Sequence, residues 1–431
     1  MLLSFRVANH GSLREPQELN LVPVYADERP ALTVAAIFGA NASGKSTVLD
    51  AMSFFTTAVR ESQARWLPDA PIPRRPFLLD RKSRDEPSTY AVDVLLDGVR
   101  YVYGFGVTDA EVTEEWLYAY PKARRRVLFE RTGMRLEYGA SLTGNRVLIE
   151  GTMRPNSLYL SAAAQSGHPQ LSALWQSMTS ALVIDDRTRR NFALMGAMPA
   201  AFMDSIAPPG VALDGVLLGS ADLGVQGVRR SATGTTPAPR KEPERAGKGP
   251  VGDDLLEAFN AAAVDSLEFI HRVGGEDFVL RAESESAGTR TWLHLVTAAV
   301  AALASGSPIW IDEIDVSLHP LLTTKLLRLF QDPELNPRGA QLIFTTHSAS
   351  LLGTMLGEQV LRRDQVWFTE KDPETAVSTL YPLSDFKPRR GENFERRYLS
   401  GSYGAVPVLP DAALEEAIKA IWGTDGEGIS A

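Results

Sequence analysis

Two glycines, a lysine and a serine stand at fixed spacing in the segment GANASGKST, which runs from Gly39 to Thr47. Gly39 is followed after four residues by Gly44, Lys45 and Ser46, and glycine lets backbone N–H groups close around phosphate oxygens. The Lys45 ammonium would neutralise β- and γ-phosphates, and the Ser46 hydroxyl would ligate Mg²⁺. The segment therefore predicts a nucleoside triphosphate site with Mg²⁺. Its further expected contacts are Asn41, Ser43 and Thr47, with Thr47 placed for the α-phosphate.

The residues on either side of this segment set the context that the motif requires. An apolar strand-like run, LTVAAIF, precedes it, and residues 46–66 follow with apolar side chains at helical spacing. A strand, a loop and a helix in this order are what a phosphate-binding loop needs, and a chance Gly-rich turn would lack them. We therefore expect a phosphate-binding loop at residues 39–47.

A second apolar run, in SPIWIDEIDVSLHP, ends in the acidic pair Asp312-Glu313. At the end of such a strand in a phosphate-loop protein, Asp312 would hold Mg²⁺. Glu313 would then be the general base for a hydrolytic water. A third run, in QLIFTTHSASLL, ends near His347, which we expect to contact the γ-phosphate or orient the water. The predicted catalytic residues are thus Glu313, His347 and Lys45, and the predicted metal ligands are Ser46 and Asp312.

The segment ESAGTRTW places Ser286, Gly288 and Thr289 just before an apolar helical pattern. By residue type alone, Ser286 is a plain helix N-cap. A helix N-terminus also presents free N–H groups and a positive dipole end to an anion. The residues themselves leave both interpretations open.

Composition restricts the class of protein. The 431 residues carry a formal net charge of −9 and no cysteine, which excludes disulfides, thiol chemistry and Cys-based zinc sites and fits a reducing cytoplasm. The run LVTAAVAALASGSPIWI is broken by Gly306 and Pro308, so it predicts a buried helix followed by a strand, and no membrane is expected as a partner. Three local basic clusters are compatible with binding to nucleic acid or to an acidic partner, although the favoured interpretation of each single cluster is a solvated face. They are Arg74, Arg75, Arg81, Lys82 and Arg84; Lys122, Arg124, Arg125 and Arg126; and Lys387, Arg389, Arg390, Arg396 and Arg397.

Changes of periodicity divide the chain. Residues 90–150 alternate apolar and polar side chains between DG and TG turns, which predicts an antiparallel sheet. The expected segments are an N-terminal ATPase lobe (1–150), a helical insertion (151–230), a flexible loop (231–254), a C-terminal ATPase lobe (255–385) and a C-terminal tail (386–431) that ends in a short helix.

Taken together, these segments resemble the ABC-class ATPases of the SMC and RecF type. They are more closely similar to the stand-alone bacterial AAA-family ATPases of the RloA, overcoming-lysogenization-defect and abortive-infection group. The similarity rests on both ends of the chain and covers the middle, about 155–260, poorly. The segments that carry it are MLLSFRVANHGSL, GANASGKST, SADLGV, ESAGTRTW, IDEIDVSLHP, TTHSASLL and RRGENFERRYLSGSYGAVP.

The resemblance implies an α/β fold of the ABC type of P-loop NTPase, with an N-terminal antiparallel β subdomain and a helical insertion. No residue pattern after the phosphate loop reads the base, so the choice of ATP as the nucleotide rests on the resemblance. The resemblance also implies that Ser286, Gly288 and Thr289 bind the γ-phosphate held by a second copy of the chain. Two copies would meet head to tail around two ATP molecules, with Asp315, supported by His319, in the loop that crosses the interface.

Three functions follow from these expectations. The first is a cytoplasmic ATPase that forms a homodimer or higher oligomer and controls a separate effector, a nuclease or toxin, in bacterial anti-phage defence. The second is a RecF-like DNA-maintenance ATPase, whose basic clusters would converge on one face. The third is a nucleotide-gated scaffold with little turnover, which the presence of Glu313 disfavours. The identity of the effector and its trigger, the oligomeric state beyond a dimer and the role of the insertion are not set by the sequence.

Overall fold

The computed structural model describes most of the chain outside its middle and its C-terminal end. The described residues are 1–25, 27–144, 146–185, 219, 221, 224–230, 267–354, 358–387, 391–407, 415, 416, 418 and 419. The expected loop at 231–254 lies outside these residues. So do the helical pattern at 192–206 and most of the short helix expected at 411–423.

An antiparallel sheet forms the N-terminal part of the fold, where alternating side chains predict one. Its strand order is β2-β1-β4-β5-β6-β7-β8, so the first two strands of the chain join the strands that arise from residues 88–138. The β3 strand does not join this sheet. The seven strands are β1 (Leu2–Ala8), β2 (Gln17–Asn20), β4 (Ser88–Leu96), β5 (Val99–Val107), β6 (Val112–Tyr120), β7 (Arg126–Thr132) and β8 (Arg135–Tyr138).

A second sheet gathers strands from both ends of the chain in the order β16-β15-β3-β14-β13-β9. All neighbouring strands in it are parallel except β15 and β16. Parallel strands end at the same edge of a sheet, so the loops that follow them meet there. The six strands are β3 (Val34–Gly39), β9 (Leu182–Ile184), β13 (Pro308–Ile311), β14 (Gln341–Thr345), β15 (Val366–Lys371) and β16 (Ser378–Pro382).

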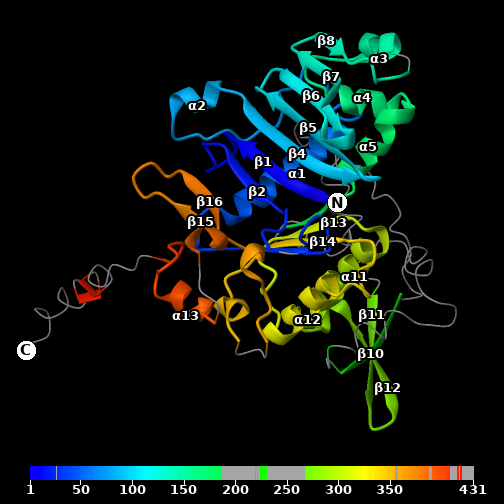
Figure 1. Ribbon diagram of the computed structural model, residues 1–431. Coiled ribbons are helices and arrows are strands. Elements are labelled where there is room, and N and C mark those ends of the chain that lie inside the picture. The colour runs from blue at the N-terminus through cyan, green and yellow to red at the C-terminus, as the bar shows by residue number, and fades with distance from the viewer. Residues whose placement is uncertain are drawn as a thin grey trace, which may run out of the picture.

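Helices fill the space between the two sheets and cover the far face of the second sheet (Figure 1). The helix α1 (Lys45–Glu61) packs between the sheets: Phe55 contacts Phe5 of β1, and Phe5 in turn contacts Trp310 of β13. This inner layer also contains α4 (Tyr159–Gln165) and α5 (Pro169–Thr179). On the far face lie α11 (Ala287–Ser305), α12 (Pro320–Gln331) and α13 (Phe394–Leu399).

The range expected as a helical insertion, 151–230, is partly β structure and partly integral to the core. The helices α4 and α5 contact α1, and β9 adds an edge strand to the parallel sheet. Three apolar residues are too few to show a strand period in the sequence. A separate three-stranded antiparallel sheet joins β10 (Val225–Arg230), β11 (Leu267–Val273) and β12 (Glu276–Arg281).

The C-terminal segment expected as a tail also packs against the core. Phe394, Tyr398 and Tyr403 are buried, and Tyr398 and Tyr403 stack on Phe368 of β15. Two short helices, α2 (Arg81–Asp85) and α3 (Arg146–Thr152), complete the main elements. The apolar run near residue 300 forms α11 and then β13, as its pattern predicts. Among the helices of the described residues, none has the length and apolar character needed to cross a bilayer.

A buried ion pair joins α4 to the antiparallel sheet. Glu115 of β6 and Arg131 of β7 are fully buried, with Oε2 and Nη1 3.3 Å apart. The Glu115 carboxylate accepts backbone hydrogen bonds from Tyr159 and Leu160 in the first turn of α4. Arg131 donates to the carbonyl oxygen of Ser157 at 2.6 Å. A carboxylate at a helix N-terminus is also favoured by the helix dipole.

This pair generates a stability prediction. Arg131→Leu would leave the Glu115 carboxylate buried without its counter-ion, and we expect the free energy of unfolding to fall by about 3–5 kcal/mol. The measurement is urea denaturation followed by far-UV circular dichroism. The control is Arg135→Leu, which breaks an ion pair to Glu137 with both side chains mostly exposed and should cost less than about 1 kcal/mol. Equal effects of the two substitutions would show that the buried pair does not hold α4 in place.

Candidate functional site

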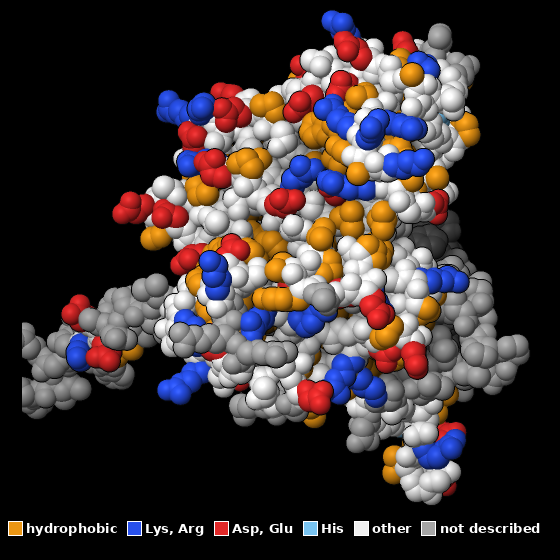
Figure 2. Space-filling model, viewed as in Figure 1, with side chains coloured by type: hydrophobic (Ala, Val, Ile, Leu, Met, Phe, Trp, Pro, Cys, Tyr) orange, Lys and Arg blue, Asp and Glu red, His pale blue; other side chains and the backbone are white. Residues whose placement is uncertain are grey.

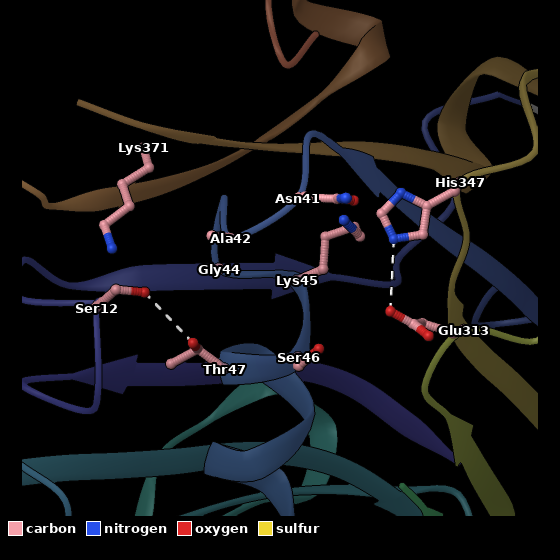
Figure 3. A pocket seen from close by; sticks show the side chains of 10 residues that line it. All are labelled: Ser12, Asn41, Ala42, Gly44, Lys45, Ser46, Thr47, Glu313, His347 and Lys371. Atoms are coloured by element: carbon pink, nitrogen blue, oxygen red, sulfur yellow. Dashed lines mark hydrogen bonds and ion pairs between the residues drawn. The ribbon is translucent and has the colours of Figure 1, made fainter. Parts of the chain in front are cut away.

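A cavity of about 370 Å³ opens at the edge of the parallel sheet where β3, β13 and β14 end. Figure 3 shows the side chains that surround it, with Lys45, Glu313 and His347 close together on one side and Lys371 on the other. Seven of its lining residues are residues that the sequence predicts for the site. The full lining is Ser12, Asn41, Ala42, Gly44, Lys45, Ser46, Thr47, Glu313, His347 and Lys371.

Close packing fixes the path of the loop that follows β3. Gly44 has a φ of 109°, a conformation that L side chains rarely adopt, and an added Cβ would lie 2.5 Å from the Ser378 hydroxyl. At Gly39 an added Cβ would lie 2.5 Å from the carbonyl oxygen of Thr369. Glycine is therefore required at both positions by the neighbouring strands β15 and β16 as well as by any ligand.

Lys45 is buried at the N-terminus of α1, with its ammonium turned back onto the loop. Its Nζ donates to the carbonyl oxygens of Gly39 and Ala40, both at 2.9 Å. Burial lowers the pKa of Lys45, whereas the nearby carboxylates, Glu313 first, raise it. An ammonium in this position is held by weak neutral acceptors and can exchange them for phosphate oxygens.

The acidic pair after β13 is held by one hydroxyl that the sequence did not single out. Thr345, the last residue of β14, donates from Oγ1 to Asp312 Oδ1 at 2.5 Å and accepts from the Glu313 backbone N–H at 2.6 Å. Glu313 has a φ of 48°, which is rare for a side chain other than glycine. Backbone strain of this kind persists where surrounding contacts impose it, as the Thr345 bond does here.

His347 follows β14 and faces the acidic pair from the opposite side. Its Nε2 lies 3.5 Å from Glu313 Oε1, and both side chains are partly exposed. The dashed line between them in Figure 3 marks this contact. The backbone N–H of His347 donates to Asp315 Oδ1 at 3.4 Å. The structure therefore brings together the predicted base and the predicted γ-phosphate contact.

Outside the phosphate-binding loop, two of the lining residues were missed by reasoning from the sequence. The Ser12 hydroxyl comes from the loop after β1 and lies 3.3 Å from the Thr47 hydroxyl, and it accepts from Ser378 at 2.7 Å. Lys371 ends β15. Neither residue belongs to a motif, so only the pairing of distant segments places them at the cavity.

Several predicted site residues do not line this cavity. The Ser43 side chain bonds to Thr369 at 2.7 Å, and Asp312 is turned toward Thr345. Asp312 and Asp315 nevertheless lie close enough to raise the pKa of Lys45. The described residues that line the cavity do not include these members of the predicted set: Gly39, Ser43, Asp312, Asp315, Ser286, Gly288 and Thr289.

The N-terminus of α11 is built as a capped helix end. Ser286 Oγ accepts from the backbone N–H of Thr289 at 3.0 Å, so Ser286 is the N-cap. An added Cβ on Gly288 would lie 3.0 Å from the carbonyl oxygen of Ser317, so this helix end abuts the loop that follows Glu313. Ser286 is exposed. His319, expected to support Asp315, caps α12 by accepting from Leu321 N–H at 3.3 Å.

Comparison with known proteins identifies the family. A family model described as "AAA domain, putative AbiEii toxin, Type IV TA system" matches residues 34–353, well over half of the 431 residues. Comparison with curated proteins finds no match. The matched range begins at β3 and includes the phosphate-binding loop, the acidic pair and His347. The chain therefore belongs to this AAA-domain family of putative AbiEii toxins of Type IV toxin–antitoxin systems.

Proposed function

We propose that this chain is an ATP-hydrolysing ATPase of the ABC type. Two copies close head to tail around ATP in the cytoplasm, and their nucleotide state controls a separate effector, a nuclease or toxin, in abortive infection. The observation that carries the proposal is that Lys45, Glu313 and His347 line one cavity beside the phosphate-binding loop, with His347 Nε2 3.5 Å from Glu313 Oε1. A buried ammonium, a carboxylate base and an imidazole are the groups that hydrolysis of a terminal phosphate needs.

The chemistry assigned to these residues is the in-line attack of water on the γ-phosphate. Glu313 accepts the proton of the attacking water, and the bond from the γ-phosphorus to the bridging oxygen of ADP breaks. Lys45 leaves its carbonyl acceptors to bind β- and γ-phosphate oxygens. His347 holds the γ-phosphate or the water from the side opposite the loop. Stabilisation of charge at fixed positions is the main source of catalysis in phosphoryl transfer.

Mg²⁺ fits the oxygen donors that are present. The Ser46 hydroxyl lines the cavity, and the Asp312 carboxylate is oriented by Thr345 near the Lys45 ammonium. Hydroxyl, carboxylate, water and phosphate oxygens are the ligands that Mg²⁺ prefers. When bound, the ion would neutralise charge on the β- and γ-phosphates. Ser46 and Asp312 are the residues proposed to hold it.

An adjoining cavity offers space for the nucleoside. It has a volume of about 390 Å³ and shares Ser12 and Lys371 with the phosphate cavity. Its wall includes the apolar side chains of Pro76, Phe77 and Leu78. Apolar walls suit a flat base. The choice of adenine rests on the resemblance to ABC-class ATPases.

A second copy is proposed to complete the site through the N-terminus of α11. Ser286 and Gly288 lie outside the cavity of their own chain, while the helix end presents N–H groups and a positive dipole end. A γ-phosphate held by a second copy would satisfy these groups. Thr289 is buried and bonded to the Ser286 hydroxyl, and Asp315, which accepts from the His347 backbone, is proposed to lie at the same interface.

The regulatory role rests on the resemblance to abortive-infection ATPases, and the family description supports it only as far as a partner protein. That description names a putative toxin of a Type IV toxin–antitoxin system, which implies a partner. The DNA-maintenance alternative requires the basic clusters to act together, but Arg74 is buried and bonded to Asp109 and to the carbonyl oxygen of Glu86. Arg75 pairs with Asp50, and Arg397 pairs with Glu392. Two residues of the first cluster and Arg397 of the third are therefore engaged within the chain, and the effector-controlling function is favoured.

The Thr345 hydroxyl provides a test of the acidic pair. Thr345→Val would remove both hydrogen bonds that orient Asp312 and Glu313, and we expect the rate of ATP hydrolysis to fall about 10–100-fold with little loss of ATP affinity. Phosphate release and equilibrium ATP binding are the measurements.

Two controls accompany Thr345→Val. Thr345→Ser keeps the hydroxyl and should retain activity. Thr324→Val changes a buried hydroxyl that has no hydrogen-bond partner among the described residues and should have no effect. If Thr345→Val hydrolyses ATP at the wild-type rate, Asp312 and Glu313 do not need the Thr345 hydroxyl for activity.

The composite site is tested by mass in solution. Glu313→Gln should lower hydrolysis by at least about 100-fold by removing the general base. The same variant should form a dimer when ATP and Mg²⁺ are added, measured by light scattering after size exclusion.

A pair of second substitutions separates the anion site from helix capping. Asp and Asn both cap helices well, but only Ser286→Asp would place a negative charge against the γ-phosphate. In the Glu313→Gln background, Ser286→Asp should abolish the ATP-dependent dimer and Ser286→Asn should preserve it. If the Ser286→Asp variant still forms the ATP-dependent dimer, the composite site is wrong. If Glu313→Gln hydrolyses ATP at the normal rate, Glu313 is not the general base.

A further inference from the structure

The seven-stranded sheet has an outer face, opposite the face that packs on α1, α4 and α5. Its inner side chains, such as Phe5, Tyr103 and Leu117, belong to the core. Side chains alternate across a strand, so their neighbours point outward. The strand registers align Arg6, Ala91, Gly104, Trp116 and Glu130 in one row across five strands of this outer face.

Aromatic rings lie along the centre of this face. Trp116 lies across Gly104: an added Cβ at Gly104 would be 2.3 Å from the indole and 2.8 Å from the Ala91 Cβ. Small residues on β4 and β5 thus leave room for a flat ring. Tyr118 and Tyr120 follow Trp116 on the same side of β6, and all three are half-buried.

Basic side chains surround these rings. The Arg125 guanidinium lies 3.8 Å from the centre of the Tyr118 ring, and that of Arg100 lies 5.0 Å from the centre of the Tyr120 ring. The side chains of Arg6, Arg100 and Arg125 are 44%, 50% and 51% exposed. Figure 2 shows Lys and Arg side chains gathered over this sheet, with hydrophobic side chains between them. The exposed residues Lys122 and Arg124, in the turn between β6 and β7, extend the basic surface.

Carboxylates offset part of this charge, and the registers place Glu18, Glu114 and Glu137 toward the margins of the same face. Asp93 pairs with Arg6 and Arg100, and Glu130 pairs with Arg125 and accepts from the Tyr118 hydroxyl at 2.6 Å. Near Tyr118 and Tyr120, however, the four cations Arg100, Lys122, Arg124 and Arg125 outnumber Asp93 and Glu130, on a chain whose net charge is −9. The ion pairs with Asp93 and Glu130 hold the guanidinium groups of Arg100 and Arg125 against the tyrosine rings. The surface is therefore a local exception to the acidic character of the protein.

We propose that this outer face binds a single-stranded nucleic acid. Flat aromatic and guanidinium surfaces stack on unpaired bases, and the surrounding cations neutralise the phosphodiester backbone. A duplex encloses its base faces and would leave Trp116, Tyr118 and Tyr120 unused. An acidic peptide would use the cations but offers no regular series of flat rings. The chemistry of the face thus matches an unpaired polynucleotide, either RNA or DNA.

This inference does not depend on the proposed function. The face is formed by β1, β4, β5, β6 and β7, whereas the phosphate cavity lies at the ends of β3, β13 and β14. Binding can therefore be measured without nucleotide. A Lys45→Ala variant, deficient in the phosphate site, should bind the strand as tightly as the wild type does.

The experiment uses the full chain and fluorescein-labelled 20-nucleotide oligouridylate and oligothymidylate, with binding followed by anisotropy at several salt concentrations. Removing two charges, with Lys122→Gln and Arg124→Gln together, should weaken binding about tenfold at low salt and make the salt dependence less steep. Tyr118→Leu should weaken it about tenfold by loss of stacking. The matched control, Arg81→Gln with Lys82→Gln on α2, removes the same charge from another surface and should leave affinity unchanged.

Other outcomes overturn the proposal. A 20-base-pair duplex that binds as tightly as the single strands, with no effect of Tyr118→Leu, would show a surface that recognises charge alone. Oligoglutamate that competes as well as the oligonucleotides would point to an acidic protein partner. An equal loss from the α2 control variant would show that binding is not located on this sheet. Circular dichroism of each variant confirms that the fold is retained.

Discussion

The parallel pairing of β14 between β3 and β13 is the constraint on which the functional site depends. In its register, Thr345 lies opposite Ile37 of β3, and Phe344 lies opposite Ile311 of β13. The three strands therefore end within a residue or two of one another, and the phosphate-binding loop, the acidic pair and His347 emerge at one edge. Thr345 reinforces this alignment, because its hydroxyl binds both residues of the acidic pair. A shift of one residue in this pairing would turn Thr345 to the other face of the sheet.

The helix α1 couples this site to the core. It begins at Lys45 and carries Phe55, which packs on Phe5 and stacks with Phe105 of the antiparallel sheet. The same helix thus presents the ammonium at one end and fills the space between two sheets along its length. Because interiors are close-packed, α1 holds the phosphate-binding loop in a fixed position relative to the antiparallel sheet. The structure provides a physical connection between the nucleotide cavity and the sheet whose outer face carries the basic and aromatic side chains.

Charge is distributed unevenly, and burial determines what each cluster can do. Arg74 and Arg131 are buried and bonded to carbonyl and carboxylate oxygens, so they serve the fold. Arg100 and Arg125 are half exposed and lie against tyrosine rings, so they remain accessible to a ligand. The α11 N-terminus is a third case, since its cap satisfies one N–H while its end stays exposed. Residues of one type therefore stabilise the core in one place and form a recognition surface in another.

The sequence by itself determined the phosphate-binding loop, the acidic pair and the strand that ends near His347. These features are local: glycine spacing, an apolar run and the residues at its end are all read within a dozen positions. The sequence also predicted α11, β13 and an antiparallel sheet near residues 90–150, because their periods extend over many residues. Only the tertiary structure decided that Ser12, Lys371 and Thr345 belong to the site and that β9 joins the parallel sheet. It also separated the buried Arg74 from the exposed Arg124 and Arg126, which the composition presented as equivalent clusters. The reason is that these outcomes depend on pairing between segments hundreds of residues apart, and a local pattern carries no information on which distant strand lies beside it.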